Sequence, residues 1–340
     1  MYDLCAIIQT IHSPEDRHRL FQRARKVTPG TAVLRGRYRF EEEEFSVQSV
    51  LGGGESGRVM RGTFGARTVV IKRNVNVAMR EDVNEAIMQT RLYCYLKEHG
   101  HMTNRDIALV PEAVFTASIP GFGRLLGMEP VDTPLLAHVQ QLKTPSAQVR
   151  SLRGALVKVC QLLVILQEKL SFMHGDLHGE NVMVRGSDVF LIDFGMSSAR
   201  FDHSPRMRTS ARYDGIPFHT QLDLMTLLTS LREDLGLSGH DEIAAWCGAF
   251  VDPFWDTVRT ALLNGTRTNL PYGAQKTVRT ALDEISSSGE VYYAHHLLYE
   301  DIGRVSYPPC EPRNLLRRLR SPSHRSSNGA SARDRLFEDV

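Results

Sequence analysis

The sequence predicts an α+β protein in two lobes, a small lobe built on an antiparallel sheet and a larger lobe that is mainly helical. Two patterns carry this prediction. Between residues 45 and 128, short alternating segments typical of strands surround one helical segment. After residue 132 the strand patterns become sparse, and residues 151–170 show a long amphipathic helical pattern.

Length and composition place the chain among ordinary globular proteins. Its 340 residues are enough for one large or two modest domains, and 42% hydrophobic with 24% charged residues argues against the disordered and fibrous classes. The formal net charge of +2 gives no electrostatic reason to expect nucleic acid or membrane binding over the whole surface. No basic segment precedes the first apolar residues, and no apolar run is long enough for a membrane span, so we expect neither a signal peptide nor a membrane anchor.

The cysteines are spread along the chain without any CxxC pair. Such spacing predicts neither a zinc site nor a disulfide framework. Free thiols are typical of a reducing compartment, and the sequence therefore predicts an intracellular protein, cytoplasmic or nuclear. The five positions are Cys5, Cys94, Cys160, Cys247 and Cys310.

Four segments are expected along the chain. Residues 1–44 form an N-terminal helical extension, because Ser13 to Asp16 combine an N-cap, a first-position proline and acids in the first turn of a helix that runs to about Lys26. Residues 45–131 form the small lobe and residues 132–312 the large lobe. Residues 313–340 form a basic tail, in which the Ser, Arg, Gly and Asn content of residues 321–334 predicts disorder.

The small lobe is expected to contain several strands and one helix. Alternation and turn residues predict the strands, and apolar residues at helical spacing, ending before Gly100, predict the helix. The strands are Phe45–Leu51, Arg58–Thr63, Thr68–Lys72 and Phe122–Met128, and the helix is Arg80–Glu98.

A glycine-rich turn joins the first two of these strands. Gly52, Gly54 and Gly57 form the pattern G-x-G-x-x-G. Glycines allow a hairpin backbone to fold closely over the phosphates of ATP. A dinucleotide-binding site would require a helix to begin at the glycines, and no helix is predicted there. The alternative is a flexible hairpin without a ligand.

Lys72 ends a predicted strand beyond the glycines, where its ammonium group can reach the α- and β-phosphates of a nucleotide. Such a lysine needs an acidic partner from the following helix. Glu85 is the preferred partner, with Glu81 one turn earlier on the same face, whereas alignment on the helix end places Gln89 in the partner position. The alternative is a solvated edge charge.

The most specific motif is His174-Gly175-Asp176-Leu177-His178-Gly179-Glu180-Asn181, followed downstream by Asp193-Phe194-Gly195. The two motifs resemble the catalytic loop and the metal-binding motif of the protein-kinase superfamily over about residues 45–250. The resemblance implies a two-lobed protein-kinase-like fold with ATP and Mg²⁺ as cofactors. Asp176 would accept or orient the proton of a hydroxyl, and Asn181 and Asp193 would bind the metal.

The resemblance implies further roles. Lys72, Glu85 and Asp176 form the catalytic set, and the Glu129 carbonyl and the Val131 amide pair with adenine. His174 braces the loop and does not bind a metal. Asp223 anchors the loop, with an ordinary helix N-terminal acid as the alternative. The nucleotide is held by Leu51, Gly52, Gly54, Gly57, Val59, Val70, Lys72, Glu129 and Val131.

The sequence also departs from ordinary protein kinases. Gly175 stands where regulated kinases have an arginine, His178 stands where serine/threonine kinases have a lysine, and no A-P-E motif follows Asp193. The string H-G-D-L-H is similar to that of aminoglycoside and choline kinases, and H-x-D-L-H also occurs in the haspin type of protein kinase. The compact build and divergent activation segment are similar to kinases encoded by large DNA viruses, which would place the protein in an infected host cell.

We therefore interpret the chain as an ATP-dependent serine/threonine protein kinase whose partner is a protein substrate. The alternatives are a small-molecule kinase and a pseudokinase that acts as a binding scaffold. A nucleic-acid-binding module has only the charge of the tail in its favour. The basic segment Arg313–Arg320 either binds acidic partners or caps the large lobe, and the arginine-rich loop Met196–Pro217 is either substrate-facing or merely solvated. The oligomeric state stays open.

Overall fold

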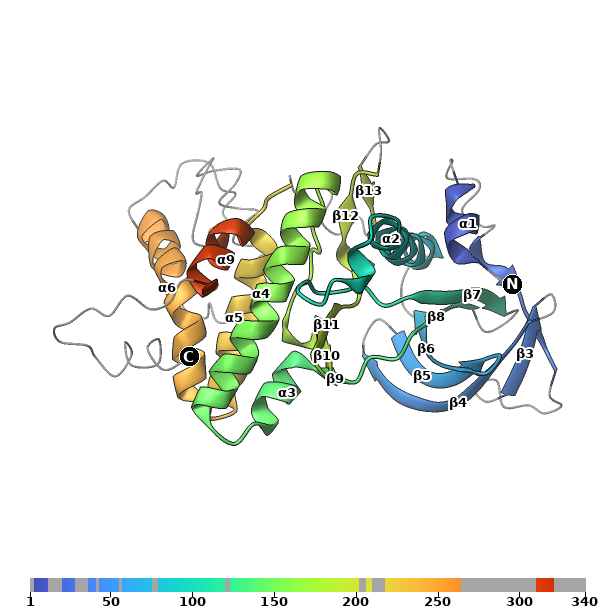
Figure 1. Ribbon diagram of the computed structural model, residues 1–340, viewed down its shortest axis with the longest axis horizontal. Coiled ribbons are helices and arrows are strands. Elements are labelled where there is room, and N and C mark those ends of the chain that lie inside the picture. Colours follow the sequence, from blue (N-terminus) through green and yellow to red (C-terminus); the bar gives the residue numbers. More distant parts are fainter. Residues whose placement is uncertain are drawn as a thin grey trace.

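The computed structural model describes most of both expected lobes (Figure 1). The described residues are 3–11, 20–27, 36–40, 43–54, 57–74, 79–119, 123–201, 206–209, 218–263 and 310–320. The segment 321–334, for which the sequence predicts disorder, lies outside them.

The small lobe is built on an eight-stranded sheet with the order β1-β7-β8-β6-β5-β4-β3-β2. All pairings are antiparallel except that of β1 with β7. The strands are β1 (Gln22–Arg23), β2 (Arg25–Lys26), β3 (Gly36–Phe40), β4 (Glu43–Gly54), β5 (Gly57–Phe64), β6 (Arg67–Asn74), β7 (Ala113–Ile119) and β8 (Gly123–Met128).

The other strands belong to two small sheets of the large lobe, with the orders β11-β10-β9 and β12-β13. These strands are β9 (Thr133–Pro134), β10 (Val182–Arg185), β11 (Asp188–Leu191), β12 (Ser198–Ala199) and β13 (Met207–Arg208). The α-helices are α1 (Leu4–Gln9), α2 (Met79–Glu98), α3 (Leu135–Gln141), α4 (Pro145–Leu170), α5 (Leu222–Leu237), α6 (Asp241–Leu263) and α9 (Pro312–Arg320). Short 3-10 helices are η2 (His101–Thr103), η3 (Gly179–Asn181) and η4 (Phe194–Met196).

Figure 1 shows the curled sheet and α2 at one end of the molecule and the helices α3 to α6 with α9 at the other. The chain passes between them through residues 129–132, where Pro130 keeps the backbone out of a helix. This is the two-lobed, protein-kinase-like α+β fold that the sequence predicts. The prediction of fold class is confirmed.

Aromatic rings fill the concave side of the small-lobe sheet. Phe45 stacks on Tyr38 with ring centroids 5.1 Å apart, and the Phe115 ring lies 4.7 Å from Phe45 and 5.1 Å from Phe64. Three of these rings are almost fully buried, with 1%, 1% and 0% exposure for Tyr38, Phe45 and Phe115. Packed rings of this kind contribute both apolar burial and favourable ring geometry.

The long helix α4 forms the centre of the large lobe. It starts earlier than predicted, because the Thr144 hydroxyl accepts a hydrogen bond from the Ala147 amide (3.2 Å) and Pro145 occupies the first turn. It ends where Ser171 adopts a left-handed conformation with φ of 46°. One face of α4 is buried, and this face packs in the core cluster that also includes residues of α5, α6 and α9.

The N-terminal segment differs from its prediction. The structure places β1 and β2 at residues where the sequence predicts the end of a helix running to about Lys26, so that part of the prediction is wrong. Gln22 pairs with Ala117 and Arg25 with Arg39, which shows that tertiary strand pairing overrides the local helix signal. The segment is therefore part of the small-lobe sheet. Residues 12–19, where that helix would start, lie outside the described residues.

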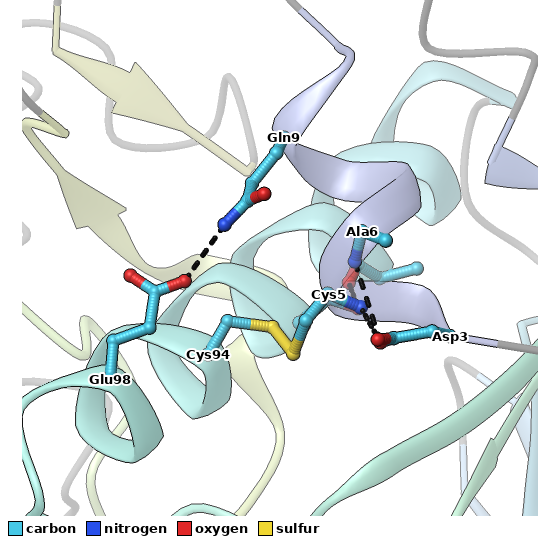
Figure 2. Close-up of a disulfide and its surroundings, with 8 residues drawn as sticks. Asp3, Cys5, Ala6, Gln9, Cys94 and Glu98 are labelled. Atoms are coloured by element: carbon cyan, nitrogen blue, oxygen red, sulfur yellow. Dashed lines mark hydrogen bonds between the residues drawn. A yellow bond between two sulfur atoms is a disulfide. The ribbon is translucent and has the colours of Figure 1, made fainter.

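A disulfide joins Cys5 of α1 to Cys94 of α2, with Cα atoms 5.7 Å apart (Figure 2). The expectation of no disulfide is therefore wrong for this pair. Asp3 caps α1 by accepting hydrogen bonds from the amides of Cys5 and Ala6, and Gln9 donates to Glu98, so polar contacts flank the cross-link. The remaining cysteines, Cys160, Cys247 and Cys310, are free and buried.

The basic segment Arg313–Arg320 lies within α9, which packs against α4 (Figure 1). Pro312, Leu315 and Leu319 are buried, and the Arg153 guanidinium donates to the Leu319 carbonyl (2.7 Å). Of the two interpretations left open by the sequence, the structure shows the capping of the large lobe. The arginine residues of the helix are exposed, and the Arg318 guanidinium lies over the Phe250 ring, 4.7 Å from its centroid. Within the described ranges, no helix is both long and apolar enough to cross a membrane.

We expect reduction of the disulfide between Cys5 and Cys94 to lower the free energy of unfolding by about 2–4 kcal/mol, because the cross-link closes a long loop of the unfolded chain. Urea denaturation of the wild type with and without dithiothreitol measures this loss. Cys5→Ala is the control, since its unfolding should not respond to dithiothreitol. Thiol titration of the unreduced, denatured protein should find three thiols, and a result of five would show that the bond does not form.

Candidate active site

Neighbouring strands place three residues predicted to bind nucleotide, and a fourth residue beside them, in one row across the small-lobe sheet. Gly52 of β4 pairs with Val59 of β5, Val59 pairs with Lys72 of β6, and Lys72 pairs with Leu126 of β8. Directly paired residues point to the same face of a sheet. The glycine-rich turn and the Lys72 side chain are thus presented on a common surface, and Val70, two residues before Lys72, shares that face.

The glycine-rich turn is a strand-to-strand hairpin, as the sequence predicts. Gly54 pairs with Gly57, and no helix starts there. The register shifts between Val50 and Gly52, which leaves Leu51 unpaired and 50% exposed. Val50 is also 52% exposed, so two large apolar side chains next to the turn are accessible to a ligand.

Lys72 lies between two carboxylates. Its Nζ donates to Glu85 Oε1 and to Asp193 Oδ1, both at 2.7 Å. Lys72 and Glu85 are largely buried, with side-chain exposures of 14% and 5%, while Asp193 is 40% exposed. Burial alone would lower the pKa of Lys72, but the two carboxylates outweigh burial and raise this pKa above its ordinary value. Lys72 is therefore charged at neutral pH.

Helix α2 supplies Glu85 as the partner of Lys72. Gln89, the alternative from the sequence, is buried elsewhere and donates its amide to the Pro111 carbonyl (3.1 Å). Gly195 allows the close approach of the acids, since a Cβ there would lie 3.2 Å from Asp193 Oδ1 and 3.8 Å from Glu85 Oε2. The structure thus decides the ambiguity in favour of Glu85. The side chain of Glu81 is not among those described.

Backbone hydrogen bonds to buried side chains hold the loop that carries Asp176. Asp223 of α5 is fully buried and accepts from the amides of His174 (2.9 Å) and Gly175 (3.0 Å). Burial raises the pKa of Asp223 to about 6, against the opposing effect of these two amides. Ser230, also on α5, accepts from the Gly179 amide at 3.1 Å. Asp223 is therefore more than an ordinary acid in the first turn of a helix, because its carboxylate holds the backbone of the loop.

His174 is a buried, neutral brace. Its Nε2 donates to the Ile192 carbonyl (3.0 Å), and its ring lies 5.3 Å from that of Phe194 and 6.3 Å from that of Phe172. Burial lowers the pKa of His174 to about 4. Because the ring links the catalytic-loop segment to the residue before Asp193, it positions both motifs.

Asp176 and Asn181 lie within this loop. Asn181 donates its amide to the Asp176 carbonyl (2.8 Å) and to His178 Nε2 (3.0 Å). The His178 Nε2 lies 3.8 Å from Asp176 Oδ2, so the imidazole ring lies beside the Asp176 carboxylate. The Asp176 side chain is 45% exposed and accessible to a substrate hydroxyl.

Asp193 adopts a left-handed backbone conformation, with φ of 62° and ψ of 74°. Such a conformation is costly for a residue with a side chain, by roughly 1–3 kcal/mol, and is often found at functional sites. Its Oδ1 accepts from Lys72 and from the Gly195 amide (3.4 Å). Burial would raise the pKa of Asp193, but Lys72 outweighs burial and holds this pKa below its ordinary value. Asp193 is therefore an anion at neutral pH.

Asn181 and Asp193 fit a magnesium site by their donor chemistry. The Ile192 amide donates to the Asn181 carbonyl (3.0 Å). Because Asp193 follows Ile192 directly, this bond links the backbone next to Asp193 to that of Asn181. In the described part of the chain, nothing donates to Asn181 Oδ1 or to Asp193 Oδ2, so one neutral and one anionic oxygen stay available, as Mg²⁺ prefers. Among all residues that the structure describes, no three or more His, Cys, Asp or Glu side chains cluster so that they could hold a metal ion.

The connector between the lobes leaves two backbone groups available for adenine. The Glu129 amide donates to the Glu112 carbonyl (2.9 Å), but no described residue pairs with the Glu129 carbonyl or the Val131 amide. Arg185 holds the connector through the Glu129 carboxylate (3.1 Å) and the Pro130 carbonyl (2.8 Å). Arg185 was not predicted from the sequence, because its partners Glu129 and Pro130 lie far from it along the chain.

Gly175 meets a steric limit that the sequence did not show. Its φ is 81°, a conformation that favours glycine, and a Cβ at this position would collide with the Met196 carbonyl oxygen. No arginine can occupy the position without moving the loop. The departure from ordinary kinases at Gly175 is thus coupled to the close packing of the catalytic loop on η4.

Comparison of the sequence with protein-family models and with curated proteins finds no match in either case. Among solved structures, the chain is similar to that of vaccinia related kinase 3, with a TM-score of 0.37 and 12% sequence identity. The alignment covers 57% of this chain and 55% of that one, so the chain spans about half the length of the structure it matches. We therefore base the fold assignment on the strand order and the two lobes, and carry no function over from this likeness.

We expect Gly175→Ala to lower the free energy of unfolding by at least about 2 kcal/mol, because it adds both backbone strain and a collision with the Met196 carbonyl. Urea denaturation measures the loss. Gly186→Ala is the matched control, since Gly186 has φ of 59° but open space around the added Cβ, so it adds strain alone. Equal losses in the two variants would show that the collision is relieved.

The low pKa of His174 predicts a stability change with pH. The folded state prefers the neutral ring, so its contribution to stability is complete above pH 6.5 and is lost as the pH falls from 6.5 to about 4. Between pH 7 and pH 5 this loss is about 2 kcal/mol.

Urea denaturation at both pH values, for the wild type and for His174→Gln, isolates this effect, since Gln retains a donor for the Ile192 carbonyl and Asp223 titrates in both proteins. The free energy of unfolding of the variant should decrease less between pH 7 and pH 5 than that of the wild type. Equal decreases would show that the ring is not buried as a neutral group.

Proposed function

We propose that this chain is an ATP-dependent phosphotransferase that moves the γ-phosphoryl group of ATP to a hydroxyl, with serine or threonine of a protein as the acceptor. The observation that supports this most is Lys72, held at 2.7 Å from both Glu85 and Asp193 beneath a glycine-rich hairpin. These contacts join the small and the large lobe at one point. Phosphoryl transfer depends on positioning and charge neutralisation, and the site is built for both.

Each residue has a distinct task in this proposal. The glycine turn and Lys72 bind the nucleotide phosphates, and the backbone of Glu129 and Val131 orients the base. Asn181 and Asp193 would hold Mg²⁺, which when bound neutralises charge on the phosphates. Asp176, exposed beside them, orients the acceptor hydroxyl and takes its proton.

The glycine-rich hairpin favours a protein acceptor, and the motif around His178 favours a small-molecule acceptor. The glycine pattern and the hairpin context are typical of protein kinases. His178 lies 3.8 Å from Asp176, and its motif is similar to that of kinases acting on small hydroxylated molecules, which makes a small-molecule kinase the second candidate. The accessible oxygens of Asn181 and Asp193 weigh against a scaffold without activity, because a pure binding role does not require them.

We expect wild-type protein with Mg-ATP to transfer phosphate to serine or threonine of a generic protein substrate, and Asp176→Asn to reduce the rate by about a hundredfold or more. Radioactive phosphate transfer from γ-labelled ATP measures the rate. Asp188→Asn, the same change on β11 outside the site, should leave the rate unaltered. A panel of hydroxylated small molecules is run in parallel, and labelling of these alone would establish the second candidate.

A thermal shift with Mg-ATP separates the remaining outcomes. Bound nucleotide stabilises the folded state by RT ln(1 + [L]/Kd), so at a fixed nucleotide concentration the melting temperature rises with affinity. A shift in both the wild type and Asp176→Asn, with no transfer by the wild type to any acceptor, would show that the chain is a nucleotide-binding scaffold and that the proposal is wrong.

A further inference from the structure

A cavity lies in the large lobe, on the exposed side of α4. It measures about 540 Å³ and is bordered by one face of α4, the last residue of α9 and the segment before β7. We call it the α4–α9 cavity. None of its lining residues belongs to the candidate active site.

The α4–α9 cavity is strongly basic. Arg150, Arg153, Lys158 and Arg320 line it, and Asp106 is the only carboxylate among the lining residues that the structure describes. Four cations against one carboxylate leave a local excess of positive charge, although the whole chain has a formal net charge of only +2. A hollow lined by one sign of charge concentrates ligands of the opposite sign.

Backbone carbonyls accept hydrogen bonds from two of the cations. Arg153 Nε donates to the Leu319 carbonyl and Lys158 Nζ to the Ser187 carbonyl, both at 2.7 Å. Arg320 contacts the side-chain amide of Gln161. Among the residues described, no carboxylate forms an ion pair with Arg150, Lys158 or Arg320. The charges of Arg150, Lys158 and Arg320 are therefore not neutralised by a carboxylate of the described residues.

The shape and the lining favour a peptide over a nucleic acid. The volume lies within the range of roughly 300–1,000 Å³ found for ligand sites. Gly154 at its centre has open space where a Cβ would lie, and Val157 adds apolar surface beside the aliphatic parts of the arginines. The described lining residues include no aromatic side chain, so they offer nucleobases no platform for stacking.

We propose that the α4–α9 cavity is a docking site for an acidic segment of a partner protein. Carboxylate side chains of that segment bind the guanidinium groups of Arg150 and Arg320, which suit paired hydrogen bonds to carboxylates. The segment's apolar atoms rest on Val157. Docking is separate from phosphoryl transfer, because no lining residue reaches the candidate active site.

Fluorescence anisotropy with the whole chain, without nucleotide, tests the proposal. The probe is a short fluorescein-labelled peptide of alternating glutamate and leucine. We expect it to bind, to bind more weakly as salt rises because the charges are partly exposed, and to lose about tenfold in affinity in Arg150→Glu. Gly154→Glu should cause a similar loss while folding normally, since replacement of a helical glycine favours the helix.

Matched variants isolate the charge. Gly154→Gln adds the same bulk as Gly154→Glu without the charge, so we expect it to bind the peptide about tenfold more tightly than Gly154→Glu. Lys169→Glu makes the same charge change as Arg150→Glu, but on an exposed site at the end of α4, and should leave affinity unchanged.

Three results would overturn the proposal. The first is no binding of the glutamate peptide to the wild type, and the second is equal affinity in Gly154→Glu and Gly154→Gln. The third is tighter binding of a short single-stranded oligonucleotide than of the peptide, with the oligonucleotide lost in Arg150→Glu, which would assign the cavity to nucleic acid. All of these measurements are independent of whether the chain transfers phosphate.

Discussion

The paired contacts of Lys72 determine how the two lobes meet. Its ammonium group comes from the sheet, Glu85 from α2, and Asp193 from the large lobe. Each of these charges is costly to bury alone, and removing one partner of a buried pair is far more destabilising than the pair is stabilising. The arrangement is thus mutually dependent. The position of α2 against the sheet, and of both against η4, follows from keeping these three groups together.

The rest of the site is fixed by backbone contacts. Asp223 and Ser230 hold the loop from α5, His174 ties it to Ile192, and Asn181 closes it internally. Side chains that hold backbone in this way leave the reactive oxygens accessible. Preorganised groups need little rearrangement when charge develops beside them. The left-handed conformation of Asp193 is tolerated because this surrounding network maintains it.

Local sequence predicted much of the fold and most of the site, because motif spacing and hairpin glycines act over short distances. The glycine turn, Lys72 and the catalytic-loop motif lie together as expected. The partner of Lys72 could be identified only from the structure, because Glu85 and Gln89 lie one turn apart on the same helix. The strands before residue 41, β7 and the disulfide were missed, because they depend on partners far away in sequence: Cys5 and Cys94 are 89 residues apart.

These distant pairings also constrain the order in which the small lobe can form during synthesis. The first strand of the sheet, β1, pairs only with β7, so Gln22 has no strand partner until Ala117 has been made. During synthesis the apolar face of α1 therefore stays uncovered until α2 and β7, which pack against it, have been made. Contacts between residues so far apart close slowly, and uncovered apolar surface favours aggregation in the meantime. The sheet can therefore grow from its β2 edge, and its β1 edge is completed last.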